Sequence, residues 1–451
     1  MTFALLALTL LVLLGIPAAL CLDPHLPGPA LLGLGFLLGA GIMPLLLLTL
    51  SLLGIPWSLP SVAVSGTLLT ALLLFVWRQG KSSRKRERHW DAPAAGRDAF
   101  VARILDAFTA VAVLGHGIYA SLARPGHWDF WSIWGFKGQA FWLHRGVDWN
   151  FLKDSANSYA HPDYPPLLPL VLDFFALVGG GWTDRWMGLI FTGFGLALLL
   201  VCRELFREEL RGRAMASLAT LALAGAALNP WIGLAEGPLI AYGGLALLLV
   251  RRGLREESSP SFALAGCLLG FAALTKNEGL ALLVSVAMAL LLDSALARRR
   301  LLRLWPAAVI VAFWWIPRIF HGISSWLVVG ALLDRASDHW KDPIVSWKAL
   351  ATYWWQPFLW LSIAATLLFC RREIARRDRF LITAVAIQMA FYLFSYATGP
   401  HDLKWQISTS WPRLLSHLLL PLLFLALTCL VRALSGEKLL AEPRWNRISE
   451  A

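Results

Sequence analysis

Long apolar runs separated by short polar connections dominate the sequence, and they predict helices that cross a lipid bilayer. A helix needs about 20 apolar residues to span the hydrocarbon core. The pattern predicts about thirteen such spans, near residues 2–22, 30–54, 60–77, 104–122, 185–201, 214–232, 237–250, 262–275, 279–293, 304–320, 358–370, 380–398 and 413–432. We therefore expect an all-α polytopic membrane protein.

Basic residues gather in several of the connections, and they predict the orientation of the chain. Lys and Arg are enriched in cytoplasmic loops. The basic segments share one side only if the short apolar stretch 167–178 does not cross, so we expect a juxtamembrane or re-entrant helix there. These segments are 78–88, 203–213, 251–255, 297–303 and 371–379. The connections expected to face outward are 123–184, 233–236, 321–357 and 399–412, with the tight turn 275–279.

The basic segment near residue 80 divides the chain. Residues 1–77 are expected to form an accessory bundle of three helices, and 78–103 a basic cytoplasmic linker. A transmembrane core follows over 104–432, and 433–451 form a cytoplasmic tail. The front helices contain almost no ionisable residues, which argues against a transport pathway through them.

Composition supports a membrane protein and excludes other classes. The chain is 58% hydrophobic and 15% charged, with a mean hydropathy of +0.62. Its net charge of +12 comes from basic clusters between apolar runs, which favours cytoplasmic loops over nucleic-acid binding. The five cysteines lie in or beside apolar runs without paired spacing, so neither a disulfide framework nor a zinc site is expected. The first run lacks a basic n-region and is expected to be retained as a helix.

The segment between Leu122 and Pro166 carries the densest set of polar and aromatic residues. Anchoring at the membrane interface needs aromatic rings alone. The acids and bases that accompany the tryptophans therefore predict a functional site at the membrane surface. These residues are Asp129, Lys137, His144, Asp148, Lys153, Asp154, His161 and Asp163.

Three short motifs, in their order along residues 104–432, resemble the GT-C glycosyltransferases. The resemblance is to glycosyltransferase family 39, with the protein O-mannosyltransferases and the aminoarabinose transferase of lipid A. The motifs are Asp129 in GHWDFW, the segment HPDYPPL at 161–167, and Ala235-Glu236-Gly237-Pro238-Leu239. Asp129 lacks the second adjacent acid of many members, and Glu236 stands where Asp is commoner.

The resemblance implies a GT-C-like transmembrane core whose outer loops carry juxtamembrane helices. It implies a hexosyl- or pentosyltransferase that moves a sugar, with inversion, from a polyprenyl-phosphate donor to a glycan, lipid or protein acceptor. The expected location is the bacterial cytoplasmic membrane, with the site on the periplasmic face. The partners are then the lipid-linked donor, the acceptor and membrane lipid, and not nucleic acid.

Asp129 and Glu236 are the candidate catalytic residues. An inverting transfer needs a carboxylate that takes the proton of the acceptor hydroxyl, and Asp129 is the candidate base. The alternative is that Asp129 caps the following helix. Glu236 precedes Pro238 and either caps its own helix or orients the acceptor. No metal ligands are assigned and no cofactor is expected with certainty, while a divalent metal held by Asp129, Glu236 and Asp163 stays open.

Cations that steady the departing phosphate are the second requirement. Lys137 either binds this phosphate or snorkels from an interfacial helix. Lys276 either binds phosphate or forms a salt-bridged hairpin with Glu278. Arg413 is the best second cation, because Arg binds phosphate bidentately, with headgroup snorkelling as the alternative. The further candidates for substrate binding are His161, Asp163, Tyr164, Glu278, His401 and Lys404. For His161 and Asp163 the alternative is a solvated pair in a turn whose prolines shape the entry to the re-entrant helix.

Two other classes compete with a transferase. A transporter or flippase of lipid-linked glycans would place ionisable residues in mid-span, with broken helices or repeats. In this chain the polar residues gather at one interface, which favours an enzyme. A family member without catalytic activity is the third class. The outer connection 321–357 is a candidate acceptor surface, with Asp334, Arg335, Asp338, His339, Lys341, Trp340, Trp347, Trp354 and Trp355.

Overall fold

The computed structural model is helical, with no strand in the part of the chain that it describes. That part covers residues 2–80, 96–123, 125–210, 212–229, 231–293, 297–323, 343–353, 356–399 and 401–434. Within it, eight helices are long and apolar enough to cross a membrane. They are α1 (Thr2–Leu22), α2 (Gly28–Leu52), α3 (Leu59–Gly80), α4 (Arg97–Ala123), α8 with α9 (Asp184–Glu209), α11 to α12 (Glu236–Glu256), α21 (Arg379–Thr398) and α22 (Leu403–Leu434).

Other apolar helices are shorter. They are α7 (Leu167–Gly179), α10 (Arg213–Ala227), α13 (Ser259–Thr275), α14 (Asn277–Asp293), α16 (Trp305–Phe320) and α19 (Pro357–Phe369). A helix occurs at each expected span, and the eight long ones indicate an integral membrane protein; thirteen crossings stay a prediction. The 13 residues of α7 rise only about 20 Å, so this helix is too short to cross, as expected. The helix α19, at the predicted span 358–370, also has 13 residues and is equally short.

Ion pairs join the basic connections at one end of the bundle, which we call the arginine end. Arg251 of α12 binds Glu209 of α9 at 2.6 Å and also contacts Asp378, just before α21. Arg432 of α22 binds the same Glu209 at 2.7 Å and Glu373 of α20 (Arg371–Arg377) at 3.0 Å. The segments 203–213, 251–255 and 371–379 therefore lie at the same end of the bundle, as the prediction requires, whereas most of 78–88 lies outside the described residues.

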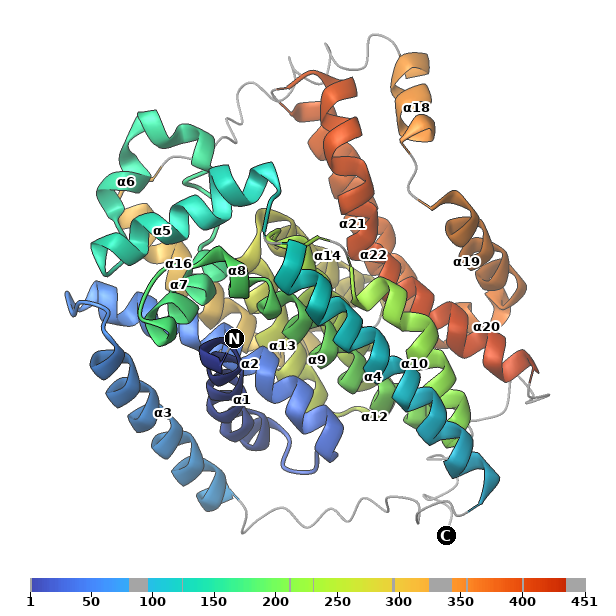
Figure 1. The fold of residues 1–451 in the computed structure, drawn as a ribbon. Helices are drawn as coiled ribbons and strands as arrows, with labels where there is room; N and C mark the ends of the chain where they lie inside the picture. The colour runs from blue at the N-terminus through green and yellow to red at the C-terminus, as the bar shows by residue number, and fades with distance from the viewer. Residues whose placement is uncertain are drawn as a thin grey trace.

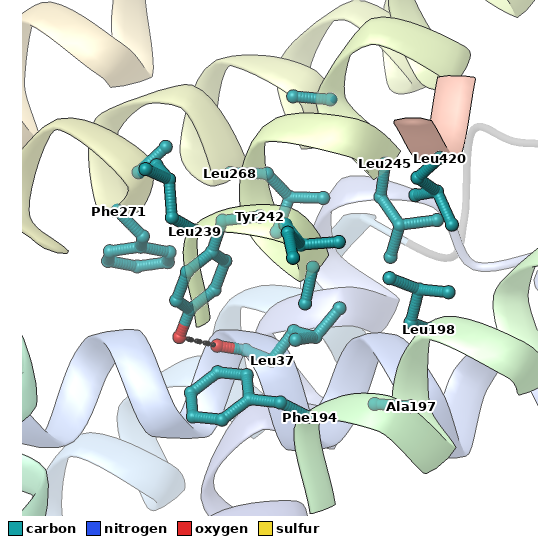
Figure 2. Packing of buried hydrophobic residues seen from close by; sticks show 14 of the residues in the cluster. Leu37, Phe194, Ala197, Leu198, Leu239, Tyr242, Leu245, Leu268, Phe271 and Leu420 are labelled. Carbon is teal, nitrogen blue, oxygen red and sulfur yellow. Dashed lines mark hydrogen bonds between the residues drawn. The ribbon is translucent and has the colours of Figure 1, made fainter. Parts of the chain in front are cut away.

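The first two helices pack into the core instead of standing beside it. In Figure 1, α1 and α2 lie against the central helices and α3 lies at the edge. The hydroxyl of Tyr242, in η4 (Ile240–Gly244), donates to the carbonyl of Leu37 in α2 at 2.9 Å, among Phe194, Leu239 and Phe271 (Figure 2). Of the expected accessory bundle, α3 alone is peripheral, with a single buried residue, Val62.

The end opposite the arginines, which we call the loop end, carries the long segment 123–184. This segment folds into η2 (Phe130–Trp134), α5 (Gly135–His144), α6 (Trp149–Lys153), η3 (Ser155–Ala160) and α7. The amide of Val147 donates to the hydroxyl of Ser51 at 2.8 Å, and that of Trp57 to the carbonyl of Arg145 at 2.8 Å. These bonds fix the segment on the α2–α3 turn. The remaining helices are α15 (Ala297–Leu302) and α18 (Pro343–Thr352).

The expected outer connection 399–412 is wrong in its length, because α22 begins at Leu403. Asp402 precedes the helix, and its carboxylate accepts from the amide of Trp405 at 2.8 Å. The hydroxyls of Thr409 and Ser410 bond back to carbonyls one turn earlier, at 2.9 and 2.7 Å. Polar residues that suggest a loop are thus satisfied inside a helix.

Candidate functional site

Five charged residues from distant parts of the sequence meet at the loop end and form what we call the ion-pair chain. The guanidinium of Arg413 lies 2.5 Å from the carboxylate of Asp129, and its Nε lies 3.3 Å from Oε1 of Glu236. The ammonium of Lys276 lies 3.2 Å from the same Oε1 and 2.8 Å from Oε1 of Glu278. All five residues were expected in the site, and the structure brings them together.

Asp129 occupies the N-cap position of η2, but its side chain makes no capping hydrogen bond. The carboxylate instead reaches Arg413 and keeps 21% of its side-chain surface exposed. Its amide donates to Nδ1 of His127 at 3.2 Å. The capping alternative therefore does not describe Asp129, and its acid group remains partly accessible beside a cation.

Glu236 begins α11 and is only 1% exposed, again without a capping bond from its side chain. Both of its cations approach Oε1, and Oε2 accepts no hydrogen bond from any residue that the structure describes. Gly233, at φ 90°, turns the chain just before this helix. A Cβ there would lie 2.8 Å from Pro125 and 3.2 Å from Phe130, so the turn needs glycine to approach the Asp129 segment.

Lys276 and Glu278 lie in the tight turn between α13 and α14. A Cβ on Gly279 would lie 1.9 Å from the carbonyl of Ala272, so glycine lets the two helices meet this closely. The expected salt bridge across the turn is confirmed. Burial alone would lower the pKa of Lys276, but Glu236 and Glu278 more than offset this and raise it above its usual value.

Lys137 is fully buried in α5, which excludes snorkelling. Its ammonium donates to the carbonyls of His161 and Tyr164 at 2.7 and 3.3 Å. Burial lowers its pKa to about 7, against the opposing effect of Asp163. His161 adopts a left-handed conformation, with φ 49°, and burial lowers its pKa. Lys137 thus stabilises the turn 161–164 through two of its backbone carbonyls.

The aromatic rings of this turn form a stack. The ring of Tyr164 lies between those of Trp134 and His161, with centroids 5.6 and 4.7 Å away. Burial raises the pKa of the Tyr164 hydroxyl, which stays neutral. The stack fixes the direction of the turn that carries Asp163.

Asp163 joins the turn 161–164 to the α13–α14 hairpin. Its side chain is 3% exposed, and Nδ2 of Asn277 donates to its Oδ2 at 3.5 Å. The positive charges of Lys137 and Arg318 act on the same neighbourhood. Asp163 therefore lies next to the ion-pair chain, through the residue between Lys276 and Glu278.

The other expected residues are less closely tied to this cluster. His401 packs its ring against Trp405, with centroids 5.3 Å apart, and Lys404 is exposed and makes no ion pair with any described residue. The residues of the expected acceptor surface lie outside the described residues, except Trp347, whose backbone is described but whose side chain is not. The members of this surface are Asp334, Arg335, Asp338, His339, Trp340, Lys341, Trp347, Trp354 and Trp355.

Sequence reasoning missed several buried polar residues near the ion-pair chain. His417 lies one helical turn beyond Arg413, and its Nδ1 is 3.0 Å from the hydroxyl of Tyr392. Gln388 donates to the carbonyl of Glu278 at 3.2 Å and receives the hydroxyl of Ser285 at 2.8 Å. The sequence offered one signal for them: His417 is a polar residue on an apolar helix, one turn after Arg413.

A scan of protein-family models and searches of curated proteins and of solved structures found no match for this chain. The likeness to the GT-C glycosyltransferases therefore depends on the three motifs alone.

Proposed function

We propose that this protein is a membrane glycosyltransferase that moves a sugar from a polyprenyl-phosphate donor to an acceptor at the loop end. The ion-pair chain is the observation that carries the proposal. Charges are costly in an apolar bundle and mark functional sites. This set combines a partly exposed acid, Asp129, with two cations, Arg413 and Lys276, which is the chemistry that a lipid phosphate donor requires.

The proposed step is a displacement at the anomeric carbon. An acceptor hydroxyl attacks this carbon, the bond from the carbon to the phosphate oxygen breaks, and polyprenyl phosphate leaves. Asp129 takes the proton of the attacking hydroxyl. Arg413 and Lys276 stabilise the negative charge that develops on the leaving phosphate. Attack from the face opposite the phosphate gives inversion.

Glu236 and Lys137 act as positioning residues in this proposal. Glu236 is buried and binds both cations through one oxygen, so it aims them. Lys137 has its ammonium on backbone carbonyls and holds the turn that carries Asp163. Asp129, with 21% of its side chain exposed, is the more accessible of the two candidate catalytic acids.

The test is transfer by purified protein in proteoliposomes that contain radiolabelled polyprenyl-phosphate glucose, mannose or arabinose. We expect label to leave the lipid fraction and enter an acceptor. If the label stays on the carrier but moves to the other leaflet, the protein is a flippase and not a transferase. A folded protein that does neither would be a family member without catalytic activity. The proposal places the protein in a bacterial cytoplasmic membrane, with the loop end in the periplasm.

A further inference from the structure

Four buried oxygen atoms beside the ion-pair chain accept no hydrogen bond from any residue in the described ranges. They are Oε2 of Glu236, Oε2 of Glu278, Oδ1 of Asp163 and Oδ1 of Asn277. Buried polar atoms in native proteins nearly always have partners, so each exception calls for an explanation. We call these four residues the acceptor cluster.

The four residues of the acceptor cluster are neighbours. Asn277 donates to Asp163 at 3.5 Å and directly precedes Glu278. Lys276 binds both Glu278 and Glu236, at 2.8 and 3.2 Å. Glu236 and Asp163 are 1% and 3% exposed, so their unpartnered oxygens are buried. The cluster is therefore continuous with the ion-pair chain through Lys276, Glu278 and Glu236.

None of the nearby described cations donates a hydrogen bond to these four oxygens. Lys276 binds two carboxylates, Arg413 binds Asp129 and lies against Glu236, and Lys137 donates to two carbonyls. A carboxylate can accept several hydrogen bonds and donate none when ionised. A ligand that fits these oxygens must therefore bring its own donors.

Asp173 of α7 shows what a buried acid looks like without such a setting. It is fully buried, and neither of its carboxylate oxygens has a partner among the described residues. Burial raises its pKa well above the usual value, and no neighbouring charge opposes this. Asp173 is an isolated acid, whereas Glu236 of the acceptor cluster has two cations, Lys276 and Arg413, beside it.

We propose that the acceptor cluster binds the hydroxyl groups of the transferred sugar, while Arg413 and Lys276 bind the phosphate of its carrier. Each sugar hydroxyl can donate one hydrogen bond, and one sugar ring carries several hydroxyls. A sugar can therefore supply donors to several adjacent acceptor oxygens. This inference rests on the proposed function and assigns the two parts of the donor to two groups of residues.

The test compares binding of polyprenyl phosphate with binding of its glucose, mannose and arabinose esters to purified protein in nanodiscs. We expect one ester to bind about ten-fold more tightly than the bare phosphate, as buried hydrogen bonds to charged acceptors imply. Asp163→Asn and Asn277→Ala each remove most of this preference and leave the affinity for polyprenyl phosphate unchanged. Asp154→Asn is the matched control, because Asp154 lies in the same segment, is exposed and caps η3, and Asn caps equally well.

The outcomes separate the two proposals. Wild type that binds none of the four lipids overturns the proposed function together with this inference. Wild type that binds all four equally overturns this inference alone. Variants that weaken polyprenyl phosphate and the preferred ester by the same factor also overturn it, because they would act on the fold or on the phosphate. Loss of the sugar preference in both variants, with the Asp154→Asn control unchanged, supports it.

Discussion

Glu236 is the residue on which the charge balance of the site depends. It is almost fully buried, and its Oε1 contacts both Lys276 and Arg413. A buried charge is tolerated when it is paired, and the removal of one partner leaves the other uncompensated. The three side chains therefore stabilise the fold as a unit, and the effects of substituting them should not add.

We predict that Arg413→Gln destabilises the protein by on the order of 3 kcal/mol, because Glu236 and Asp129 lose their shared cation. Glu236→Gln should destabilise it by less, since Arg413 keeps Asp129 and Lys276 keeps Glu278. The double variant should be more stable than the sum of the single effects implies. Thermal unfolding of the four proteins in detergent measures this, and simple additivity would contradict the coupling.

Lys137 gives a prediction about pH. Its pKa is lowered by burial from 10.5 to about 7 in the folded protein. Between these values the unfolded chain binds the proton and the folded chain does not, so stability rises with pH. The expected slope is about 1 kcal/mol per pH unit within this window. Below about pH 7 both states hold the proton and this contribution to the slope ends.

Lys137→Met is the variant that isolates this effect, because Met keeps the length of the side chain without the amine. We expect the unfolding temperature of wild type to rise between pH 7.5 and 9.5 relative to that of Lys137→Met. The variant is less stable at every pH, since the bonds to the carbonyls of His161 and Tyr164 are lost. Parallel pH profiles for the two proteins would show that Lys137 stays charged when folded.

At the scale of helices, the contact between α1 and α2 depends on glycine. A Cβ on Gly39 would lie 1.8 Å from the carbonyl of Leu11, and one on Gly15 would lie 1.9 Å from the carbonyl of Gly35. These distances leave no room for a side chain, so the two backbones are in direct contact. Since α2 also holds Tyr242 through Leu37, this contact supports the core around η4.

We predict that Gly39→Ala lowers stability by about 1–3 kcal/mol, because α1 and α2 must separate to admit the methyl group. Gly115→Ala in α4 is the control. Nothing lies within 4 Å of a Cβ built there, and Ala favours a helix more than Gly does. Unfolding temperatures in detergent compare the two, and equal effects would show that the α1–α2 contact is not tight.

The helices themselves follow from hydropathy, because apolar runs are a local property of the sequence. The start of α22 does not, since Ser408, Thr409 and Ser410 are polar enough to suggest a connection. Their hydroxyls bond to carbonyls of the same helix, a solution that composition does not reveal. The burial of Lys137 could not be predicted either, because its hydrogen-bond partners are backbone carbonyls of the turn 161–164.

At the scale of the whole molecule, the charges separate into two ends of one apolar bundle. Glu209 and its arginines hold one end, and the ion-pair chain lies at the other. The sequence predicted which connections share an end, because positive charge marks them. It did not reveal which residues pair, since Asp129 and Arg413 are 284 positions apart and only the fold brings them together.

The orientation of the two ends can be tested by thiol labelling. The native cysteines are replaced by Ala, and one cysteine is introduced as Asp154→Cys or as Arg371→Cys, both at exposed positions. We expect a membrane-impermeant maleimide to label position 154 in intact bacterial cells. Position 371 should be labelled only after the membrane is opened. The reverse pattern would place the ion-pair chain on the cytoplasmic side and contradict transfer to a periplasmic acceptor.

The most direct test of the proposed transfer site is the activity of Asp129→Asn beside that of Asp154→Asn. Both substitutions are isosteric and lie in the same segment, but only Asp129 contacts Arg413. Transfer of radiolabelled sugar from polyprenyl phosphate should fall at least about 100-fold in Asp129→Asn, as expected for a lost general base, and stay unchanged in Asp154→Asn. Full transfer by a folded Asp129→Asn protein would contradict the assignment of the ion-pair chain as the catalytic site.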